Sequence, residues 1–545
     1  MAVDVPGLVS VIVFYVCILS IGVWGSRKSK KVEKKCSGSK SEVAIIGGRN
    51  INILVGIFTM TATWVGGGYI MGTAESVYSP TQGLVWALGP PAYVFCFFVA
   101  GLFFAKPMRS KRYVTMLDPF QNRYGKAFTV TLLLPALASD ILWVACILAA
   151  LGGTMSIILG LSSTISIIIS AAVSIVYTLL GGLYSVAYTD IIQLCFIFFS
   201  LWLCVPFMVL NASYGKNLCA LGGLSYQALY QRILSAASSV QAQISCFAAA
   251  LTVFIMGIPS VVIGVMASAA DWNQTAYGLP PPFERGDAGK ILPLALQHLT
   301  PTWVAVLGIG SVAAAVMSSM DSALLSSASM FTQNIYKTTL RKTASDRELQ
   351  WVIRISVLVV GLAGTGLAFG DDSVFALWVL SGDLLYCVIF PQLVCVLHFQ
   401  RANTYGAFSG FVVGLLLRGL SGEPILGIPP VLLYPGWREE NNVIIQYFPY
   451  RTIAMLFSVG SILAVSCLLN LIFKHELIPQ SWDFLQAFKN KNETEEVEAP
   501  GSLEEINQAT AWPRSPSHPS RGRLAGDPFS CVAQVWYFLS AANTD

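Results

Sequence analysis

The hydrophobic residues of this chain gather into long runs that recur from its first residues to about position 474. Each run holds roughly 20 apolar residues, the number of helical residues that crosses the hydrocarbon core of a bilayer. Twelve such runs stand out, at about 6–26, 50–72, 84–105, 127–155, 163–182, 188–210, 243–270, 301–335, 351–370, 373–398, 405–426 and 452–474. The pattern predicts an all-α, polytopic membrane protein.

Basic residues between these runs predict the orientation of the spans. They cluster at 27–49, 106–126 and 337–354, and the positive-inside rule assigns all three clusters to the cytoplasm. Only five strong runs separate the second cluster from the third, so one more crossing is needed, and the weakly apolar stretch 217–233 is the candidate. We therefore predict about thirteen transmembrane helices, with the N-terminus outside the cell and the C-terminus inside.

Composition agrees with a membrane protein and argues against an enzyme. Of the 545 residues, 55% are hydrophobic and 11% are charged, whereas soluble proteins average about 25% charged residues. The surroundings we expect are therefore membrane lipid, and the small net charge of +4 suggests no nucleic-acid partner. The four histidines form no HExxH motif, and neither a GxSxG motif nor a phosphate-binding loop occurs.

The chain changes character near residue 475. Residues 1–474 form the predicted transmembrane domain, whereas 475–545 is polar and becomes rich in Ser, Pro and Arg at 513–523. A segment of this composition buries too little apolar surface to offset its loss of conformational entropy. We therefore predict a disordered cytoplasmic tail.

Two of the apolar stretches contain consecutive glycines. These residues are Gly66, Gly67, Gly68, Gly222 and Gly223. Glycine costs about 1 kcal/mol relative to alanine inside a helix, so each set predicts a helix break. In a membrane protein a broken helix is tolerated where it lines a cavity, and its free carbonyls can hold a cation. The alternative is a glycine-lined contact between two helices.

The two breaks open two successive groups of five spans, at about 50–210 and about 215–398. This arrangement is typical of transporters built from inverted repeats, in which the substrate site lies at the interface between the repeats. The residues of the two groups show no similarity to each other, so the prediction of a repeat rests on hydropathy and on the breaks.

Ala315, Ser318 and Ser319 share one face of a predicted helix, because their spacing is i, i+3 and i+4. Hydroxyl and carbonyl oxygens are the ligands that hard cations such as Na⁺ prefer. This face is therefore a candidate sodium site, to which the broken helix upstream would add carbonyl oxygens. Close packing of small residues between two helices is the alternative.

Charged and aromatic side chains within the spans supply further candidates. Ionisable groups at membrane depth indicate function by default, although these can also lie near helix ends or pair with Arg354 or Arg418. The acids are Glu75, Asp140, Asp190, Asp321 and Asp383. Ring faces can hold a quaternary amine, and the rings that could form such a cage are Trp64, Tyr93, Trp143, Tyr226 and Tyr230. Each ring could instead face lipid or pack in the core.

Five stretches of the chain resemble the sodium:solute symporter family, and the resemblance extends over most of residues 5–475. The stretches are Thr59–Glu75, Ala105–Gln121, Gly181–Asp190, Asp271–Pro280 and Ala313–Ser319. The third is similar to a family-wide signature, and the second and fourth are similar to the branch that transports choline. The resemblance implies a LeuT-like fold of two inverted five-helix repeats, preceded by one span and followed by two.

The same resemblance implies an activity and a location. The activity would be choline uptake by alternating access, driven by Na⁺ and dependent on Cl⁻, which supplies choline for acetylcholine synthesis. The location would be the plasma membrane, including presynaptic terminals, and the membrane of synaptic vesicles. A further partner that we consider is a second copy of the chain in a homo-oligomer.

Site residues follow from the resemblance position by position. The implied sodium ligands are the carbonyl groups of Ala62 and Val65 together with Ala315, Ser318 and Ser319. The implied choline cage consists of Trp64, Tyr93, Trp143 and an aromatic residue of the seventh span, for which Tyr226 is the candidate.

The seventh span departs from the family pattern in two ways. Only about twenty residues separate Leu210 from Gln231, and a helix of that length rises about 30 Å, which leaves little room for a loop. Where the family has Ile-Pro-Trp after its two glycines, this chain has Leu224-Ser225-Tyr226. The alternative hypothesis is therefore a transport-inactive or substrate-shifted member of the family.

One acceptor sequence for N-glycosylation lies in a loop that we predict to be outside the cell. It is Asn273-Gln274-Thr275, within the loop 271–300. The Asn-x-Thr pattern in an external loop predicts a glycan on Asn273.

Overall fold

The computed structural model describes residues 40–160, 162–180, 183–208, 222–370, 373–423, 426–440, 443–446 and 448–488, together with Val16, Ser20, Trp24 and Gly25. Most of the predicted first span, the beginning of the predicted seventh span and most of the predicted tail lie outside this part of the chain. The description that follows concerns the residues within it.

The described chain is almost entirely helical. Its α-helices are α2 (Lys40–Ile46), α3 (Ile53–Trp64), α4 (Gly67–Tyr78), α5 (Gly89–Val99), α6 (Ala105–Ser110), α7 (Asp118–Leu159), α8 (Ser163–Leu180), α9 (Leu183–Met208), α10 (Gln227–Ser235), α11 (Ser239–Ala269), α12 (Ile291–Leu299), α13 (Thr302–Met330), α14 (Asp346–Leu367), α15 (Val374–Leu384), α16 (Phe390–His398), α17 (Thr404–Leu420) and α18 (Tyr450–Lys474). The short strands β1 (Arg438–Glu440) and β2 (Val443–Ile445) pair in antiparallel fashion in the loop before α18.

Polar side chains mark where several of these helices begin. Asn52 precedes α3 and accepts a hydrogen bond from the Leu54 amide, and Asn403 does the same for α17. Ser345 and Glu348 form a capping box at the start of α14. These caps satisfy amide groups in the first turn that have no partner within the helix.

Eight helical segments of the described residues are long and apolar enough to cross a membrane. Each overlaps one of the runs predicted from hydropathy; the segments are Leu84–Ser110, Asp118–Ile157, Val186–Phe207, Ser239–Ala269, Thr302–Leu340, Asp346–Leu367, Val374–His398 and Tyr450–Lys474. Helices α3 and α4 together make a further span that bends by 47° at its break. Two shorter apolar helices, Ser163–Val176 and Thr404–Leu420, match the remaining predicted runs of this region.

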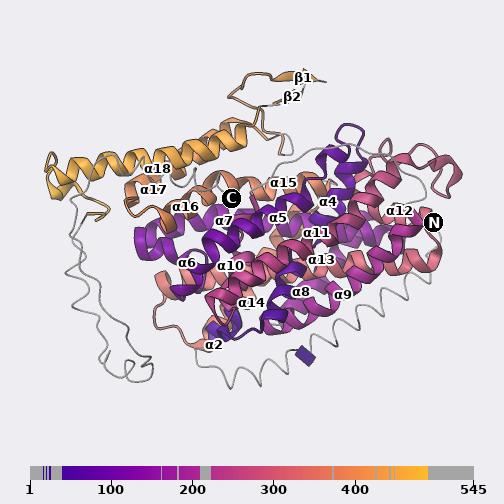
Figure 1. Cartoon of the computed structure of the whole chain (residues 1–545), viewed down its shortest axis with the longest axis horizontal. Coiled ribbons are helices and arrows are strands. Elements are labelled where there is room, and N and C mark those ends of the chain that lie inside the picture. Colours follow the sequence, from indigo (N-terminus) through magenta and orange to yellow (C-terminus); the bar gives the residue numbers. More distant parts are fainter. Residues whose placement is uncertain are drawn as a thin grey trace, which may run out of the picture.

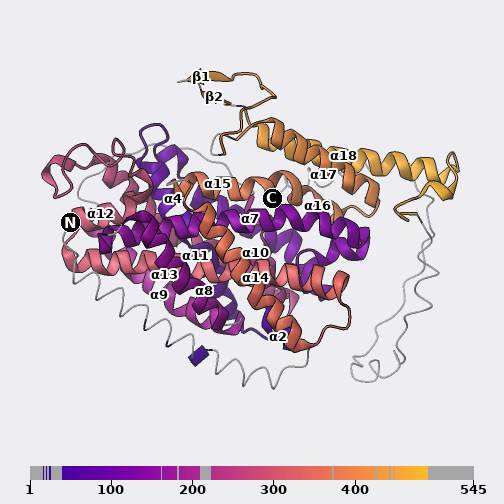
Figure 2. The same cartoon turned by 180° about the vertical axis from the view of Figure 1, so that it is seen from behind.

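The helices form one bundle around α13 and α7 (Figure 1). Helix α13 packs against α9 and α7, α15 packs against α7 and α4, and α11 covers α3, α4 and α5. Helices α17 and α18 pack on each other and lie along one side of the bundle in both Figure 1 and Figure 2. The broken span formed by α3 and α4 is therefore enclosed by other helices.

The described part of the seventh predicted span is not one continuous transmembrane helix. Gly222–Ser225 forms a 3₁₀ turn, Tyr226 is extended, and α10 then runs for nine residues. A helix of that length rises only about 14 Å, which is less than the hydrocarbon core. Every residue of α10 is buried, so this short helix lies inside the bundle and not in lipid.

Residues 475–488, which we assigned to the tail, contact the last two helices. Asp483 accepts a hydrogen bond of 3.0 Å from the hydroxyl of Tyr405 on α17, and the ring of Phe488 stacks on Phe473 of α18. The remainder of the predicted tail lies outside the described residues.

Candidate substrate and sodium site

The break between α3 and α4 is the centre of the candidate site. Helix α3 ends at Trp64, Val65 leaves the helical conformation (φ −82°, ψ 67°) and Gly66 is extended before α4 begins. A Cβ atom on Gly66 would lie 1.8 Å from the Ser319 hydroxyl oxygen and 3.6 Å from the Ala315 carbonyl oxygen. Glycine is required here because α13 approaches the backbone of the break too closely for any side chain.

Oxygen atoms from α3 and α13 gather beside this break. The Ser318 hydroxyl donates a hydrogen bond of 2.8 Å to the Ala62 carbonyl, and the Ser319 hydroxyl donates one of 2.9 Å to the Thr63 carbonyl. The structure thus brings together the five residues proposed for sodium from the sequence, and all are buried: Ala62, Val65, Ala315, Ser318 and Ser319. Neutral hydroxyl and carbonyl oxygens in this arrangement suit a hard monovalent cation.

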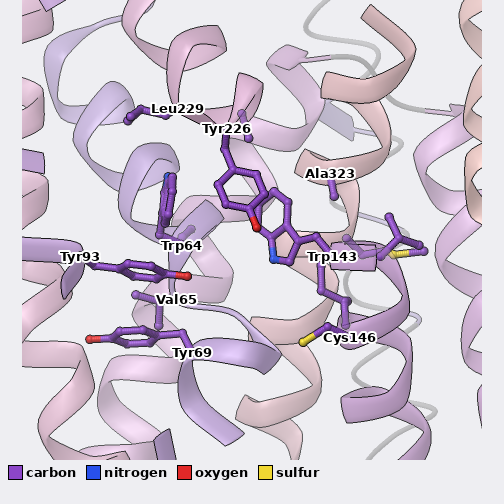
Figure 3. Close-up of a cluster of buried hydrophobic side chains, with 14 of the residues drawn as sticks. Trp64, Val65, Tyr69, Tyr93, Trp143, Cys146, Tyr226, Leu229 and Ala323 are labelled. Atoms are coloured by element: carbon purple, nitrogen blue, oxygen red, sulfur yellow. The ribbon is translucent and has the colours of Figure 1, made fainter. Parts of the chain in front are cut away.

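Four aromatic rings meet beside the same break (Figure 3). The Trp64 ring lies 4.6 Å from Tyr93, 6.3 Å from Trp143 and 5.7 Å from Tyr226, measured between ring centroids. Trp143 and Tyr226 are 4.8 Å apart. The rings come from α3, α5, α7 and the turn before α10, and all four are buried. We call these four residues the ring cluster.

The second break positions Tyr226 in this cluster. Because Tyr226 is extended between the 3₁₀ turn and α10, its ring turns toward Trp143, and its hydroxyl lies 2.7 Å from the Ser381 hydroxyl on α15. Tyr230, which we also considered for the cage, instead donates its hydroxyl to the Leu224 carbonyl at 2.8 Å and closes the turn. Of the two tyrosines, Tyr226 alone belongs to the ring cluster.

Trp378 is a neighbour of the cluster that the sequence did not reveal. It lies on α15, donates a hydrogen bond of 2.7 Å from Nε1 to the Tyr93 hydroxyl, and packs against the backbone of Gly68, where a Cβ atom would lie 3.0 Å from its ring. Its ring centroid is 5.6 Å from that of Tyr93. A tryptophan within an apolar run carries no signal that distinguishes this position from a lipid-facing one.

Asp190 is the acid that lies closest to the candidate sodium ligands. Its Oδ1 atom is 3.0 Å from the Ser318 hydroxyl, and its Oδ2 atom accepts a short hydrogen bond from Thr59. Arg232 of α10 forms an ion pair with the same carboxylate at 3.9 Å. A buried carboxylate therefore borders the oxygen site without belonging to the helix break itself.

The other intramembrane acids have separate surroundings. Asp321 accepts a hydrogen bond from Thr178 at 2.5 Å, and Asp140 accepts one from Ser327 at 2.7 Å. Glu75 accepts hydrogen bonds from the Ser373 hydroxyl and the Phe375 amide at the start of α15.

Asp383 pairs with one of the two arginines considered for it from the sequence. Its Oδ2 atom is 2.9 Å from Arg418 and 2.8 Å from Arg451, whereas the Arg354 guanidinium lies over the Trp351 ring. Within the described residues no three His, Cys, Asp or Glu side chains form a metal-binding group.

The predicted glycosylation position lies on an exposed loop. Asn273 belongs to the short turn Trp272–Gln274, which Asp271 caps by accepting a hydrogen bond from the Asn273 amide. Its side chain is exposed.

The chain matches the model of the sodium:solute symporter family over residues 45–220 and 214–414. It is 46% identical to high affinity choline transporter 1 of Homo sapiens over 532 residues, which cover 91% of each chain. It is 43% identical to high-affinity choline transporter 1 of Drosophila melanogaster, over 90% of this chain and 82% of that protein. The chain therefore belongs to the sodium:solute symporter family.

Solved structures show the same fold. A Na⁺-coupled sialic acid symporter, described as substrate-bound and outward-open, matches with a TM-score of 0.67 at 18% identity, over 85% of this chain and 97% of that one. The family and the fold are those of transporters, not of enzymes. The two parts of the family match meet at residues 214–220, in the region where we found the seventh span to be short.

Proposed function

We propose that this protein takes up choline across the plasma membrane by alternating access, coupled to Na⁺. The observation that supports the proposal is that one helix break contributes to two sites. Trp64 belongs to the ring cluster, and the carbonyls of Ala62 and Thr63 just before it bond to the serines of the oxygen site. The curated relatives that are 41% to 46% identical to the chain are named as high-affinity choline transporters, which supports choline as the substrate.

Choline suits the ring cluster for a chemical reason. Its trimethylammonium group has no N–H donor and its charge cannot be removed by deprotonation, so carboxylates and carbonyls offer it no hydrogen bond. Aromatic faces attract such a cation within about 6 Å of the ring centroid, and tryptophan does so most strongly. The substrate-binding residues in this proposal are Trp64, Tyr93, Trp143 and Tyr226.

Sodium would act as a bridge between two helices that the transport cycle must move relative to each other. In the proposal the ion binds the carbonyls of Ala62, Val65 and Ala315 and the hydroxyls of Ser318 and Ser319. A bound ion stabilises the conformation of the transport cycle in which α3 and α13 are close together. It shifts the equilibrium between that conformation and the others only as far as it binds that conformation more tightly. A requirement for Cl⁻, as the resemblance implies, belongs to the same proposal.

The proposed architecture is a LeuT-like pair of inverted repeats, at about 50–210 and 215–398, within thirteen transmembrane helices. The N-terminus lies outside and the C-terminus inside. The sialic acid symporter supports the fold, and the basic clusters support the orientation. In this orientation Asn273 is external and carries a glycan.

The short seventh span is the basis of a second hypothesis, a transport-inactive or substrate-shifted protein, which the relatives named as choline transporters do not favour. Tyr226 argues against an inactive protein, because its ring lies against both Trp64 and Trp143. Competition of choline with betaine, proline and sugars separates a shifted substrate from choline. The main proposal also includes a location, at presynaptic terminals and in synaptic vesicle membranes, and a role, the supply of choline for acetylcholine synthesis. It further includes assembly of the chain into homo-oligomers in the membrane.

The experiment is radiolabelled choline flux into proteoliposomes that contain only this purified chain. We expect saturable uptake with an inward Na⁺ gradient and none with K⁺ in its place. Trp64→Ala removes the central ring and abolishes saturable uptake, whereas Trp482→Ala, which changes an exposed ring outside the bundle core, leaves it intact. Uptake by the wild type that ignores Na⁺, or normal uptake by Trp64→Ala, contradicts the proposal.

A further inference from the structure

Arg232 is a charged side chain of α10 that neither the ring cluster nor the oxygen site contains. Its side chain is 1% exposed, and the Asp190 side chain beside it is fully buried. It follows Tyr226 by six residues on the same short segment, so α10 carries a ring-cluster residue at its start and this cation near its end. Burying a guanidinium costs several kcal/mol unless partners compensate, so its contacts require an explanation.

Two chains of contacts connect Arg232 to the proposed sodium ligands. In the first, the guanidinium lies 3.9 Å from Asp190, whose other oxygen is 3.0 Å from the Ser318 hydroxyl. In the second, Nη2 donates a hydrogen bond of 2.6 Å to the Ser322 hydroxyl, which in turn donates one of 3.0 Å to the Ser318 carbonyl. Both chains therefore end on Ser318.

Ser322 is also connected, through Thr63, to Ser319, the second serine of the oxygen site. Its hydroxyl is 3.1 Å from that of Thr63, whose carbonyl accepts the hydrogen bond of Ser319. The guanidinium is thus connected to Ser318 through one intervening residue and to Ser319 through two, Ser322 and Thr63.

The guanidinium is held incompletely. It has five N–H donors, yet among the described residues its hydrogen bonds go to Ser322 and to the Gln231 side chain, and Nε has no acceptor. The distance to Asp190 is that of an ion pair without a hydrogen bond. A partly satisfied buried network is less stable than a complete one, so a competing cation can rearrange it at low cost.

Asp190 is the group that a bound cation and the guanidinium would both use. Its carboxylate lies 3.9 Å from the Arg232 guanidinium and 3.0 Å from the Ser318 hydroxyl. Because the ion and the guanidinium then share Asp190 and the oxygens near Ser318, binding of Na⁺ weakens the hold on Arg232 and therefore on α10.

We propose that Arg232 is the positioning residue that couples the sodium site to the choline cage. Without Na⁺, Arg232 is drawn to Asp190 and Ser322 and restrains α10 together with Tyr226. With Na⁺ bound, the restraint relaxes and Tyr226 can adopt the position that choline requires. The inference rests on the proposed function, and coupling of this kind is reciprocal, so Na⁺ must raise the affinity for choline as much as choline raises the affinity for Na⁺.

The test measures Na⁺ binding in the absence of choline, and choline affinity with and without Na⁺, in purified wild type, Arg232→Gln and the double variant Asp190→Asn/Arg232→Gln. In Arg232→Gln the Asp190 carboxylate loses its counter-charge, and we expect the Na⁺ concentration for half-saturation of Na⁺ binding to fall by about fivefold or more; fivefold corresponds to about 1 kcal/mol. We also expect choline affinity to become nearly independent of Na⁺. Arg285→Gln, a change of the same kind on an exposed external loop, keeps wild-type behaviour.

The double variant guards against misfolding, because it leaves no buried charge of this pair without a partner. If Arg232→Gln fails to fold, the proposal is supported by a double variant that still binds Na⁺ directly but whose choline affinity no longer depends on Na⁺, and it is refuted by one that keeps both. A wild-type Na⁺ effect in either variant overturns it, whereas a purely structural role would lower protein yield without changing the Na⁺ dependence. Absence of Na⁺-dependent choline binding in the wild type would refute the proposed function instead.

Discussion

At the scale of single residues, the site depends on how closely α13 approaches the break of the first broken span. The closest approach is at Gly66, where the Ser319 hydroxyl occupies the position that a side chain would take. The spacing of Ala315, Ser318 and Ser319 predicted their shared face, but only the structure shows that this face meets Gly66. One residue therefore connects the helix break to the proposed ion site.

Gly66→Ala is expected to shift the Na⁺ activation of transport to higher Na⁺ concentrations. The new methyl group must displace Ser319, and overpacking of this kind costs about 1–3 kcal/mol, which at the ion site corresponds to a loss in Na⁺ affinity of roughly 5- to 150-fold. The measurement is choline uptake as a function of Na⁺ concentration. Gly366→Ala on α14, where a Cβ atom meets nothing within 4 Å, is the matched control. Normal Na⁺ activation in Gly66→Ala would show that the ion binds elsewhere.

At the scale of elements, Glu75 joins the second half of the broken span to α15. Its carboxylate accepts a hydrogen bond of 2.6 Å from the Ser373 hydroxyl and one of 2.8 Å from the Phe375 amide. A carboxylate at a helix N-terminus also interacts favourably with the helix dipole. Helix α15 carries Trp378, which binds the Tyr93 hydroxyl, so Glu75 determines how α15 lies over the ring cluster.

Glu75→Gln is expected to raise the choline concentration for half-maximal uptake by roughly tenfold, because a charge-assisted hydrogen bond contributes about 1.5–3 kcal/mol and the amide recovers part of it. The protein should still fold, since the amide oxygen can accept one of the two bonds. Uptake kinetics measure the effect. The control is Glu348→Gln, which alters the capping box at the start of α14 and should leave these kinetics unchanged. Equal effects of both variants would contradict a specific role for Glu75.

The elements also show how far sequence reasoning extends. Hydropathy located the spans, and the glycines of the first set located the break after Trp64, because both signals are local. The pairs Arg232–Asp190 and Trp378–Tyr93 were not predicted, since each joins segments that are far apart in the chain. Helix α10 has a low hydropathy because it contains the polar residues Gln227, Gln231 and Arg232, whose side chains form hydrogen bonds within the bundle that the sequence does not reveal.

At the scale of the whole molecule, α7 extends from a basic loop at its start to the loop that contains Asn273 near its other end. Near its start, Asp118 bonds to the basic loop that precedes it. Near its other end, Gly153 lies against Lys290 of the loop that follows Asn273. From Lys126 to Gly153 a helix rises about 40 Å, more than the roughly 30 Å of the hydrocarbon core. Helix α7 is therefore long enough to place the basic loop and the Asn273 loop on opposite sides of the membrane, as the proposed orientation requires.

The proposed orientation predicts the accessibility of both termini. With thirteen spans, an epitope tag at the N-terminus should bind antibody on intact cells, and a tag at the C-terminus should do so only after permeabilisation. Asn273→Gln should increase gel mobility by removing a glycan, whereas Thr275→Ser keeps the acceptor sequence and serves as the control. Two tags on the same side would require an even number of spans. In that case 217–233 would not cross, and the basic clusters at 106–126 and 337–354 would face opposite compartments, against the positive-inside rule.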